Sequence, residues 1–184
     1  MNGEIIHYDR LISTMPFPLL LQKSDIKYDE SIYNWNQVLV FNLGFDTRGK
    51  DIKSHWIYFP EVGYCFYRVG FYSNILSTDK MSLYVEIGFK KDDVICAEDW
   101  LPIVLKDLKK AGIVDEKQVL SDCEGIVMNP AYVHINSSCL SDVDEKKRLL
   151  GRDDIYSIGR YGSWTYCSIE DNIKEAKALA EQIN

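Results

Sequence analysis

The chain has 184 residues, 46% of them hydrophobic, and a formal net charge of −7. This length is enough to bury one hydrophobic core, so we expect a single domain. The acidic balance argues against nucleic acid and polybasic membrane attachment, because phosphate-rich surfaces are bound by patches of Lys and Arg. No apolar run reaches membrane-spanning length, and the N-terminus has no basic region followed by an apolar one. We therefore expect neither a membrane span nor a signal peptide.

The five cysteines and three histidines are widely separated in the sequence. No pair of them has the spacing of a metal site, and the odd number of cysteines does not indicate a disulfide framework. Reduced, mostly buried thiols are typical of proteins in a reducing compartment. The sequence therefore predicts a cytoplasmic protein without a metal.

The first half of the chain carries the patterns of β-strands. Runs of strand-forming residues predict five strands, namely Glu4–Ile12, Gln37–Phe45, His55–Phe59, Tyr64–Val69 and Lys80–Phe89. Prolines interrupt the chain after the first strand, and a short helix over Leu19–Leu21 is expected to follow them. Short turns separate the later strands, which favours a mainly antiparallel sheet.

The second half alternates between helix and strand patterns. An amphipathic helix is predicted over Ala97–Ala111, with Gly112 ending it. A strand over Val119–Met128, extended chain as far as His134, and a short helix over Asp142–Leu150 follow.

The last helix is predicted over Ile169–Ile183, with Ser168 as its N-cap and Asp171 in its acidic first turn. Its apolar residues lie along one stripe, namely Ile169, Ile173, Ala176, Ala180 and Ile183. The fold class expected from all these elements is α+β. It has a mainly antiparallel sheet of about five to seven strands, helices on one face, and a C-terminal strand, loop and helix.

A glycine corner lies between the apolar run Ile155–Ile158 and the last helix. It contains Gly159, Arg160 and Gly162. A strand, a glycine turn and a helix N-terminus together present backbone N–H groups to an anion such as a phosphate, and an arginine can add a bidentate contact. The alternative is ordinary turn chemistry, in which glycines serve only the backbone.

Segments at both ends of the chain resemble parts of FAD-dependent amine oxidase-like proteins. The segment Ile12–Leu20 resembles the place where such chains leave the FAD domain, and Ile158–Asp171 resembles their last FAD-contacting motif. The middle segments Trp56–Glu61, Phe66–Val69 and Ser82–Glu86 resemble the branch near UDP-galactopyranose mutase and protoporphyrinogen oxidase. Many members of that branch act in surface-polysaccharide biosynthesis.

One departure from this resemblance is important. The family carries a Gly-x-Gly-x-x-Gly dinucleotide fingerprint after its first strand, and this chain contains none. The chain therefore resembles the C-terminal half of such a flavoprotein. The resemblance implies a substrate domain over approximately residues 13–150 and remnants of the FAD domain over approximately 1–12 and 151–184.

The resemblance also implies roles for individual residues. FAD is the expected cofactor of the parent protein, bound weakly or not at all by this chain, and the expected substrate is a small molecule, such as a sugar nucleotide. The residues implied in FAD binding are Gly159, Arg160, Gly162, Trp164, Tyr166 and Ser168. For Trp164 and Tyr166 the alternative is packing against the sheet.

Two residues are candidates for substrate binding. Arg68 lies among aromatic residues on a predicted strand, where a guanidinium is costly unless it is paired. It could bind a substrate phosphate or form an ion pair with Glu86. Tyr132 lies where the mutase-like branch has substrate-lining tyrosines, and its alternative is packing at a sheet edge.

Two functions remain open at this stage. The first is the substrate- and cofactor-completing part of an FAD-dependent oxidoreductase or mutase-like enzyme, with this chain inactive by itself. The second is a non-catalytic binding or interaction domain that keeps the fold without FAD. The missing fingerprint and the acidic charge are compatible with the second.

Overall fold

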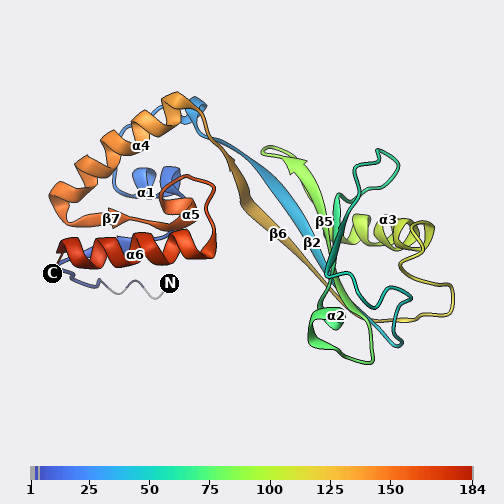
Figure 1. Ribbon diagram of the computed structural model, residues 1–184. Coiled ribbons are helices and arrows are strands. Elements are labelled where there is room, and N and C mark those ends of the chain that lie inside the picture. The colour runs from blue at the N-terminus through green and yellow to red at the C-terminus, as the bar shows by residue number, and fades with distance from the viewer. Residues whose placement is uncertain (1–2, 4, 184) are drawn as a thin grey trace. The chain divides into compact units, whose positions relative to one another are not determined.

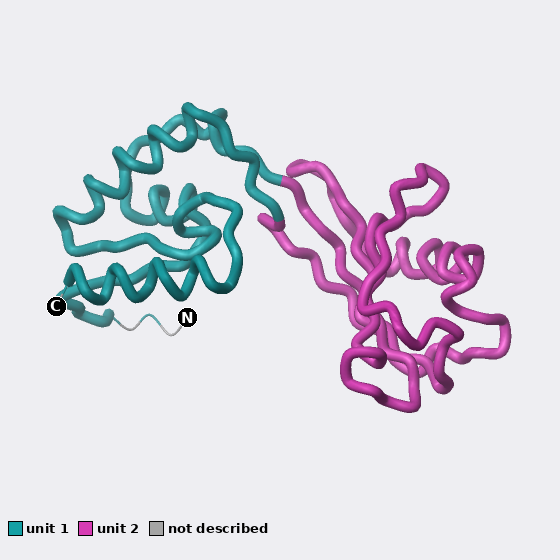
Figure 2. The backbone as a smooth tube through the Cα atoms, viewed as in Figure 1, with its two compact units in different colours: residues 1–35, 132–184 teal, residues 36–131 magenta. Residues whose placement is uncertain are grey.

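The computed structural model describes residue 3 and residues 5–183. The chain forms two compact units (Figure 2), one containing residues up to 35 together with 132–184 and the other residues 36–131. We call them unit 1 and unit 2. Two strands, β2 (Asn34–Phe45) and β6 (Leu120–His134), carry the chain from one unit into the other (Figure 1). Assignment of the units to an FAD domain and a substrate domain stays a prediction.

Unit 2 is built on a five-stranded antiparallel sheet with the strand order β3-β4-β5-β2-β6. Its other strands are β3 (Trp56–Tyr58), β4 (Arg68–Phe71) and β5 (Ser82–Lys90), and the short helix α2 (Tyr72–Leu76) follows β4. In this register Val69 lies opposite Val85, and Val85 lies opposite Phe41. The apolar members of the alternating pattern therefore fall on one face of the sheet.

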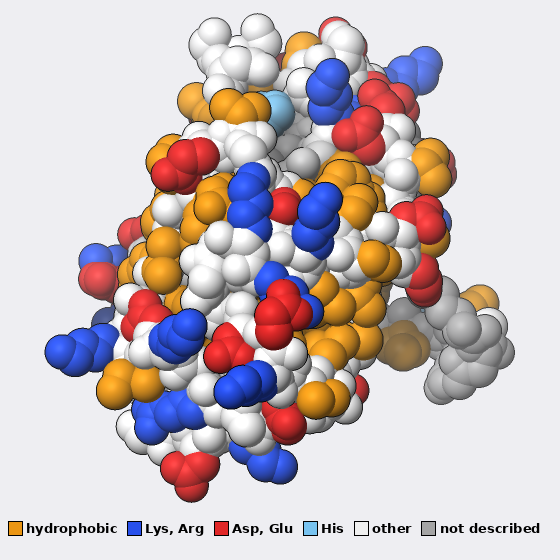
Figure 3. Space-filling model, turned by 90° about the vertical axis from the view of Figure 1, so that its right-hand side faces the viewer, with side chains coloured by type: hydrophobic (Ala, Val, Ile, Leu, Met, Phe, Trp, Pro, Cys, Tyr) orange, Lys and Arg blue, Asp and Glu red, His pale blue; other side chains and the backbone are white. Residues whose placement is uncertain are grey.

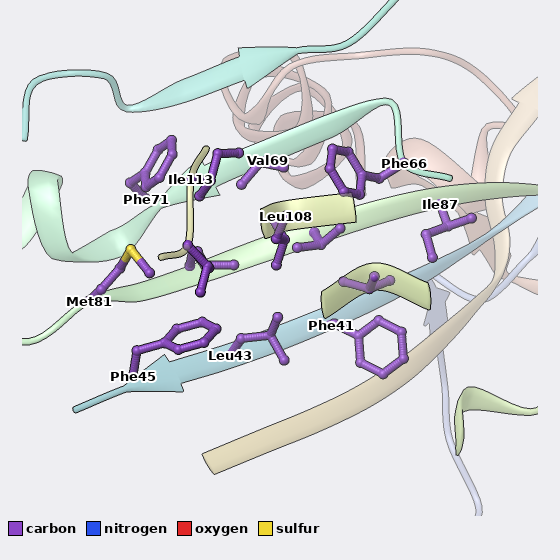
Figure 4. Close-up of a cluster of buried hydrophobic side chains, with 14 of the residues drawn as sticks. Phe41, Leu43, Phe45, Phe66, Val69, Phe71, Met81, Ile87, Leu108 and Ile113 are labelled. Carbon is purple, nitrogen blue, oxygen red and sulfur yellow. The ribbon is translucent and has the colours of Figure 1, made fainter. Parts of the chain in front are cut away.

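Helix α3 (Ala97–Lys110) packs on that apolar face. Val104 and Leu108 of α3 are fully buried against sheet residues that include Phe41 and Val69 (Figure 4). The helix agrees with the prediction, and Gly112 beyond its end has a φ of +70°, as a terminating glycine does. This layer of helix on sheet forms the core of unit 2.

The opposite face of the sheet carries aromatic and charged side chains. Trp56 and Tyr58 are exposed there, and Arg68 pairs with Glu86 across neighbouring strands. Figure 3 shows a face of the molecule on which basic and acidic side chains are interspersed, without one continuous basic surface.

Unit 1 contains a two-stranded parallel sheet of β1 (Leu11–Ser13) and β7 (Ile155–Ser157). Its helical elements are α1 (Phe17–Lys23), η1 (Glu30–Ile32), α4 (Ser137–Leu150), η2 (Gly151–Asp153), α5 (Gly159–Gly162) and α6 (Ile169–Ile183). A hydrophobic cluster that includes Phe17, Leu21, Tyr33, Leu150 and Trp164 holds them together. The Tyr33 hydroxyl donates to Asp142 Oδ2 at 2.7 Å, so its polar end is satisfied.

The broad α+β class agrees with the prediction, and the boundaries of several elements differ. Strand β1 covers three residues instead of 4–12, because only Leu11–Ser13 pairs with β7; Glu4 lies outside the described residues. Strand β4 begins at Arg68 instead of Tyr64. The backbone N–H of Cys65 donates to the Asp107 carboxylate, so this stretch is held outside the ladder.

Strand β6 continues through Pro130 to His134, which an edge strand permits. Helix α4 begins five residues earlier than predicted, because the Asn136 side chain accepts from the N–H of Cys139 and caps it.

The apolar stripe of α6 is mostly exposed. Ile169 and Ile173 are 81% and 64% exposed, and Ala176 and Ala180 are also exposed. The buried residue is Leu179, on the side of the helix that also carries Glu175. No described helix has the length and apolar content needed to cross a bilayer.

Gly70 should be required by the packing of Tyr84. A Cβ at Gly70 would lie 2.0 Å from Cε1 of Tyr84, because the tyrosine ring covers this glycine on the neighbouring strand. We expect Gly70→Ala to lower the free energy of unfolding by about 1–3 kcal/mol, measured by urea denaturation. Gly88→Ala is the control, because its Cβ would be 3.8 Å from Tyr67, an ordinary contact. Equal effects of the two substitutions would contradict this account.

Candidate functional site

The glycine corner is a single helical turn, α5, that follows β7 directly. Gly159 has a φ of +81°, a conformation that side chains disfavour. A Cβ on Gly162 would lie 2.9 Å from Ser157 Oγ and 3.1 Å from the carbonyl oxygen of Ser13. Ser157 Oγ donates to the carbonyl oxygen of Gly162 at 2.8 Å. Both glycines are therefore explained by the backbone and its packing, without a ligand.

The backbone N–H of Gly159 already has an anionic acceptor within the chain. It donates to Glu175 Oε2 of α6 at 2.7 Å. The Ser163 hydroxyl also donates to this carboxylate, and Lys147 Nζ of α4 lies 3.4 Å from Glu175 Oε1 and 2.7 Å from Ser163 Oγ. An intramolecular carboxylate thus occupies a position that the sequence suggested for a phosphate.

These contacts also set the charge state of Glu175. Partial burial disfavours ionisation, but the hydrogen bonds from Ser163 and Gly159 and the charge of Lys147 outweigh it, so the pKa of Glu175 is lowered. Glu175 and Lys147 were not among the site residues predicted from the sequence. Nothing local distinguishes them from other charged residues on helices, because their partners lie on other elements.

Arg160 contacts two tyrosine rings. Its guanidinium carbon is 5.0 Å from the ring centroid of Tyr132 and 4.7 Å from that of Tyr166. The two rings are 6.4 Å apart and inclined by 30°. Cation–π contacts of this kind fix a guanidinium in place. Three of the predicted site residues, from β6, α5 and the segment before α6, therefore meet at one point, with Tyr166 70% exposed.

Trp164 lies in the hydrophobic cluster of unit 1. It is fully buried, and its ring centroid is 5.4 Å from that of Tyr33 and 5.7 Å from that of Trp35. Its backbone has a φ of +47°, and its buried Nε1 has no acceptor among the described residues. Of the two alternatives for Trp164, packing in the protein interior is present, and a contact with a flavin stays a prediction.

Ser168 caps α6 as predicted. Its hydroxyl accepts from the backbone N–H of Asp171 at 3.1 Å, while the Asp171 carboxylate accepts from the backbone N–H of Ser168 at 2.9 Å. This reciprocal pair is a capping box. Hydrogen bonds from the backbone N–H and the hydroxyl of Ser168 to the Asp171 carboxylate lower the pKa of Asp171, so a carboxylate lies at the start of the helix.

Arg68 lies in unit 2, on the open face of the sheet. It forms an ion pair with Glu86, which also accepts from the Tyr67 hydroxyl at 2.5 Å. The Arg68 guanidinium carbon lies 5.7 Å from the ring centroid of Tyr58 and 5.8 Å from that of Tyr84. Of the two alternatives for Arg68, the ion pair is present, and a contact with a substrate stays a prediction. Within the described residues no cluster of His, Cys, Asp and Glu could hold a metal ion.

Two solved structures resemble this chain over most of its length. A reduced UDP-galactopyranose mutase matches 90% of this chain and 38% of its own, with a TM-score of 0.78 and 24% sequence identity. A putative protoporphyrinogen oxidase from Exiguobacterium sp. 255-15 matches 95% of this chain and 41% of its own, with a TM-score of 0.72 and 14% identity. The chain has an FAD-dependent amine oxidase-like fold. No family model and no curated protein matches the sequence.

The amine oxidase-like fold covers only part of each of these enzymes, since the chain spans about two fifths of their length. The residues present fit a flavin partly. Arg160 supplies a fixed cation, and the exposed ring of Tyr166 supplies a stacking surface. The Gly159 N–H is bonded to Glu175, and no Gly-x-Gly-x-x-Gly turn is present for a pyrophosphate.

The network around Glu175 should control the acid stability of the protein. Because its folded pKa is lowered, its contribution is full above the unfolded pKa, about 4.3, and is lost as the pH falls through the folded pKa. We expect Glu175→Gln to lower the free energy of unfolding by about 1–2 kcal/mol at pH 7, with a smaller difference from the wild type at acidic pH. Urea denaturation across a pH series measures this. Glu181→Gln, at an exposed position of α6, is the control; an equal loss there would contradict the role of Glu175.

The ion pair on the open sheet face should behave as a coupled unit. Arg68→Met leaves Glu86, whose side chain is only 10% exposed, without its cation. We expect a loss of about 2–4 kcal/mol in unfolding free energy. Adding Glu86→Gln removes the uncompensated charge, so the double variant should lose less than the sum of the single variants. Additive losses in thermal or urea unfolding would show that the pair is not coupled.

Proposed function

We propose that this chain is the substrate- and cofactor-completing part of an FAD-dependent oxidoreductase or mutase-like enzyme. The observation that carries the proposal is the match of 90% of the chain to the mutase at a TM-score of 0.78. The cluster of Arg160, Tyr132 and Tyr166 supports it, because it assembles three of the predicted site residues in one place. The proposed substrate is a small molecule such as a sugar nucleotide, and the proposed setting is surface-polysaccharide biosynthesis in the cytoplasm.

The residues of this chain have a limited set of tasks in this proposal. Arg160 and the exposed ring of Tyr166 would contact the flavin, and the corner Gly159–Gly162 would position them. Trp164 would support this wall from inside the cluster, and Ser168 would fix the start of α6. When bound, the flavin supplies the electron-transfer or nucleophilic chemistry.

On the substrate side, we propose Arg68 of unit 2 as a residue that binds the small molecule, and Tyr132 of unit 1 as a separate candidate for such a contact. Arg68 is held by Glu86 and by the rings of Tyr58 and Tyr84, so its guanidinium is oriented before a ligand arrives. Preorganisation of this kind lowers the entropic cost of binding.

A non-catalytic binding domain is the second candidate function. The hydrogen bond between Gly159 and Glu175 favours it, because the carboxylate satisfies the glycine corner without a cofactor. The two candidates differ in what they require of FAD.

Direct measurement of flavin binding separates the two. We expect the 184-residue chain to bind FAD more weakly than about 100 μM, because the adenine and pyrophosphate have no dinucleotide-binding turn. A protein in which this chain is joined to a dinucleotide-binding half should bind FAD. In that protein Arg160→Ala should weaken FAD binding about tenfold. Lys174→Ala, at an exposed position, is the control. Fluorescence titration of FAD measures both. Micromolar binding of FAD by the 184-residue chain alone would contradict the proposal that the dinucleotide-binding half is needed. If the joined protein also binds no FAD, the non-catalytic domain is favoured.

A further inference from the structure

A cavity of about 250 Å³ lies on the open face of the unit 2 sheet, where β5 begins and β2 ends. Strands β2, β5 and β6 and the helix α2 contribute to it, and its lining includes Asn42, Gly44, Tyr72, Ser82, Asp122 and Glu124. Ser82 is four residues along β5 from Glu86, a distance of about 13 Å on a strand. The cavity is therefore separate from the ion pair of Arg68 with Glu86.

Hydrogen bonds orient one wall of this cavity. The Tyr72 hydroxyl donates to Asn42 Oδ1 at 3.4 Å, and Asn42 Nδ2 donates to Glu124 Oε2 at 3.3 Å. The ring of Tyr84 supports the Tyr72 ring, with 5.1 Å between the two centroids. Tyr72 is 41% exposed, so one side of its ring is open to a ligand. An aromatic ring, an amide and a carboxylate are thus held side by side before any ligand binds.

Gly44 lies among these side chains, and the fold does not require a glycine there. Its φ lies outside the left-handed region, and a Cβ on Gly44 would be 3.8 Å from its nearest described neighbour, Asp122 Cβ, an ordinary contact. A glycine inside a strand costs stability and often marks a position where a ligand approaches the backbone closely. A ligand in the cavity would therefore explain this glycine, whereas the backbone and its packing do not.

The polar groups of the cavity restrict the chemistry of a ligand. The ionised carboxylates of Asp122 and Glu124 can only accept hydrogen bonds. Among the described residues that line the cavity there is no Lys, Arg or His, so an anion has no counter-charge. The ligand must offer several hydrogen-bond donors, and it needs an apolar face to pack on Tyr72.

We propose that this cavity binds one ring of a neutral sugar, a hexopyranose unit. Neighbouring hydroxyl groups of the ring donate to Asp122 and Glu124, which are two residues apart on β6 and therefore share one face of the strand. The C–H face of the sugar packs on Tyr72, and the ring lies against the bare backbone of Gly44. Cavities for drug-sized ligands begin at about 300 Å³, so a cavity of 250 Å³ suits a single ring.

This sugar site goes beyond the proposed function and does not depend on it. Every residue of the site belongs to unit 2, and no flavin takes part. A binding measurement without FAD therefore tests the sugar site alone, and its failure leaves the proposed flavin contacts unaffected.

Titration of the 184-residue chain with methyl glycosides tests the proposal. The probes are methyl glucopyranoside, methyl mannopyranoside and methyl galactopyranoside, and the backbone amides are followed by two-dimensional ¹⁵N NMR. We expect at least one glycoside to shift the amides of Gly44, Ser82 and Cys123, with half-saturation at about 1–10 mM for so small a ligand. Cyclohexylammonium, a cation with a ring but no hydroxyl group, is the comparison. No shift with any glycoside, or shifts with cyclohexylammonium alone, would overturn the proposal.

A substitution at Gly44 makes the test specific. Gly44→Val fills the cavity and should weaken glycoside binding at least tenfold, while the thermal midpoint of unfolding stays the same or rises, because valine favours a strand. Gly88→Val, on β5 and outside the lining, is the control and should bind as the wild type does. Wild-type binding by a folded Gly44→Val protein, or equal losses in the two variants, would count against the site.

A second pair of variants decides the matter if Gly44→Val does not fold. Tyr72→Ala removes the ring on which the sugar packs and should weaken glycoside binding about fivefold. Tyr58→Ala removes another exposed tyrosine of the open face, beside Arg68, and should leave glycoside binding unchanged. Weaker binding in Tyr58→Ala but not in Tyr72→Ala would place the sugar at Arg68 and overturn the proposal.

Discussion

The carboxylate of Glu175 is the constraint on which the arrangement of unit 1 depends. It joins three segments, because Gly159, Ser163 and Lys147 lie respectively at the start of α5, after α5 and on α4. A half-buried charge is costly unless hydrogen bonds and a counter-charge satisfy it. The rotation of α6 about its axis is therefore set by where Glu175 must point. Leu179 lies on the same side of the helix and is buried, whereas Ile169 and Ile173 on the other side are exposed.

This constraint explains why the apolar stripe of α6 is exposed whereas that of α3 is buried. In α3 the apolar face is the only strong preference, since its charged residues lie on the opposite face, and Val104 and Leu108 are buried as the pattern predicts. In α6 the apolar face competes with a partly buried ion network whose other members come from α4, α5 and the residue after α5. Periodicity counts apolar residues and gives no weight to a single carboxylate with three partners. Tertiary contacts decide such a case.

The same distinction applies to the candidate site. The glycine corner and the cap at Ser168 could be predicted, because each depends on a local backbone requirement. The contact of Arg160 with two rings could not be predicted, since Tyr132 belongs to β6 and meets Arg160 only through the fold. Similarly, local reasoning gave the ion pair of Arg68 with Glu86 as one alternative because of the cost of a buried guanidinium. The covering of Gly70 by Tyr84 depends on strand register, which the sequence does not reveal.

The two units differ in how completely their sheets are covered by other elements of the chain. Unit 2 has a closed layer of sheet and helix, with its apolar pattern covered by α3. Unit 1 has a satisfied ion network and a packed cluster, and among the described residues its parallel sheet has two strands with a cavity along β7. Because Glu175 holds the glycine corner through bonds within the chain, the backbone of that corner does not depend on a ligand for its shape. A corner that is formed without a ligand holds Arg160 and Tyr166 in fixed positions for contact with a cofactor. The internal carboxylate is therefore compatible with both a cofactor-completing role and a fold that persists without the cofactor.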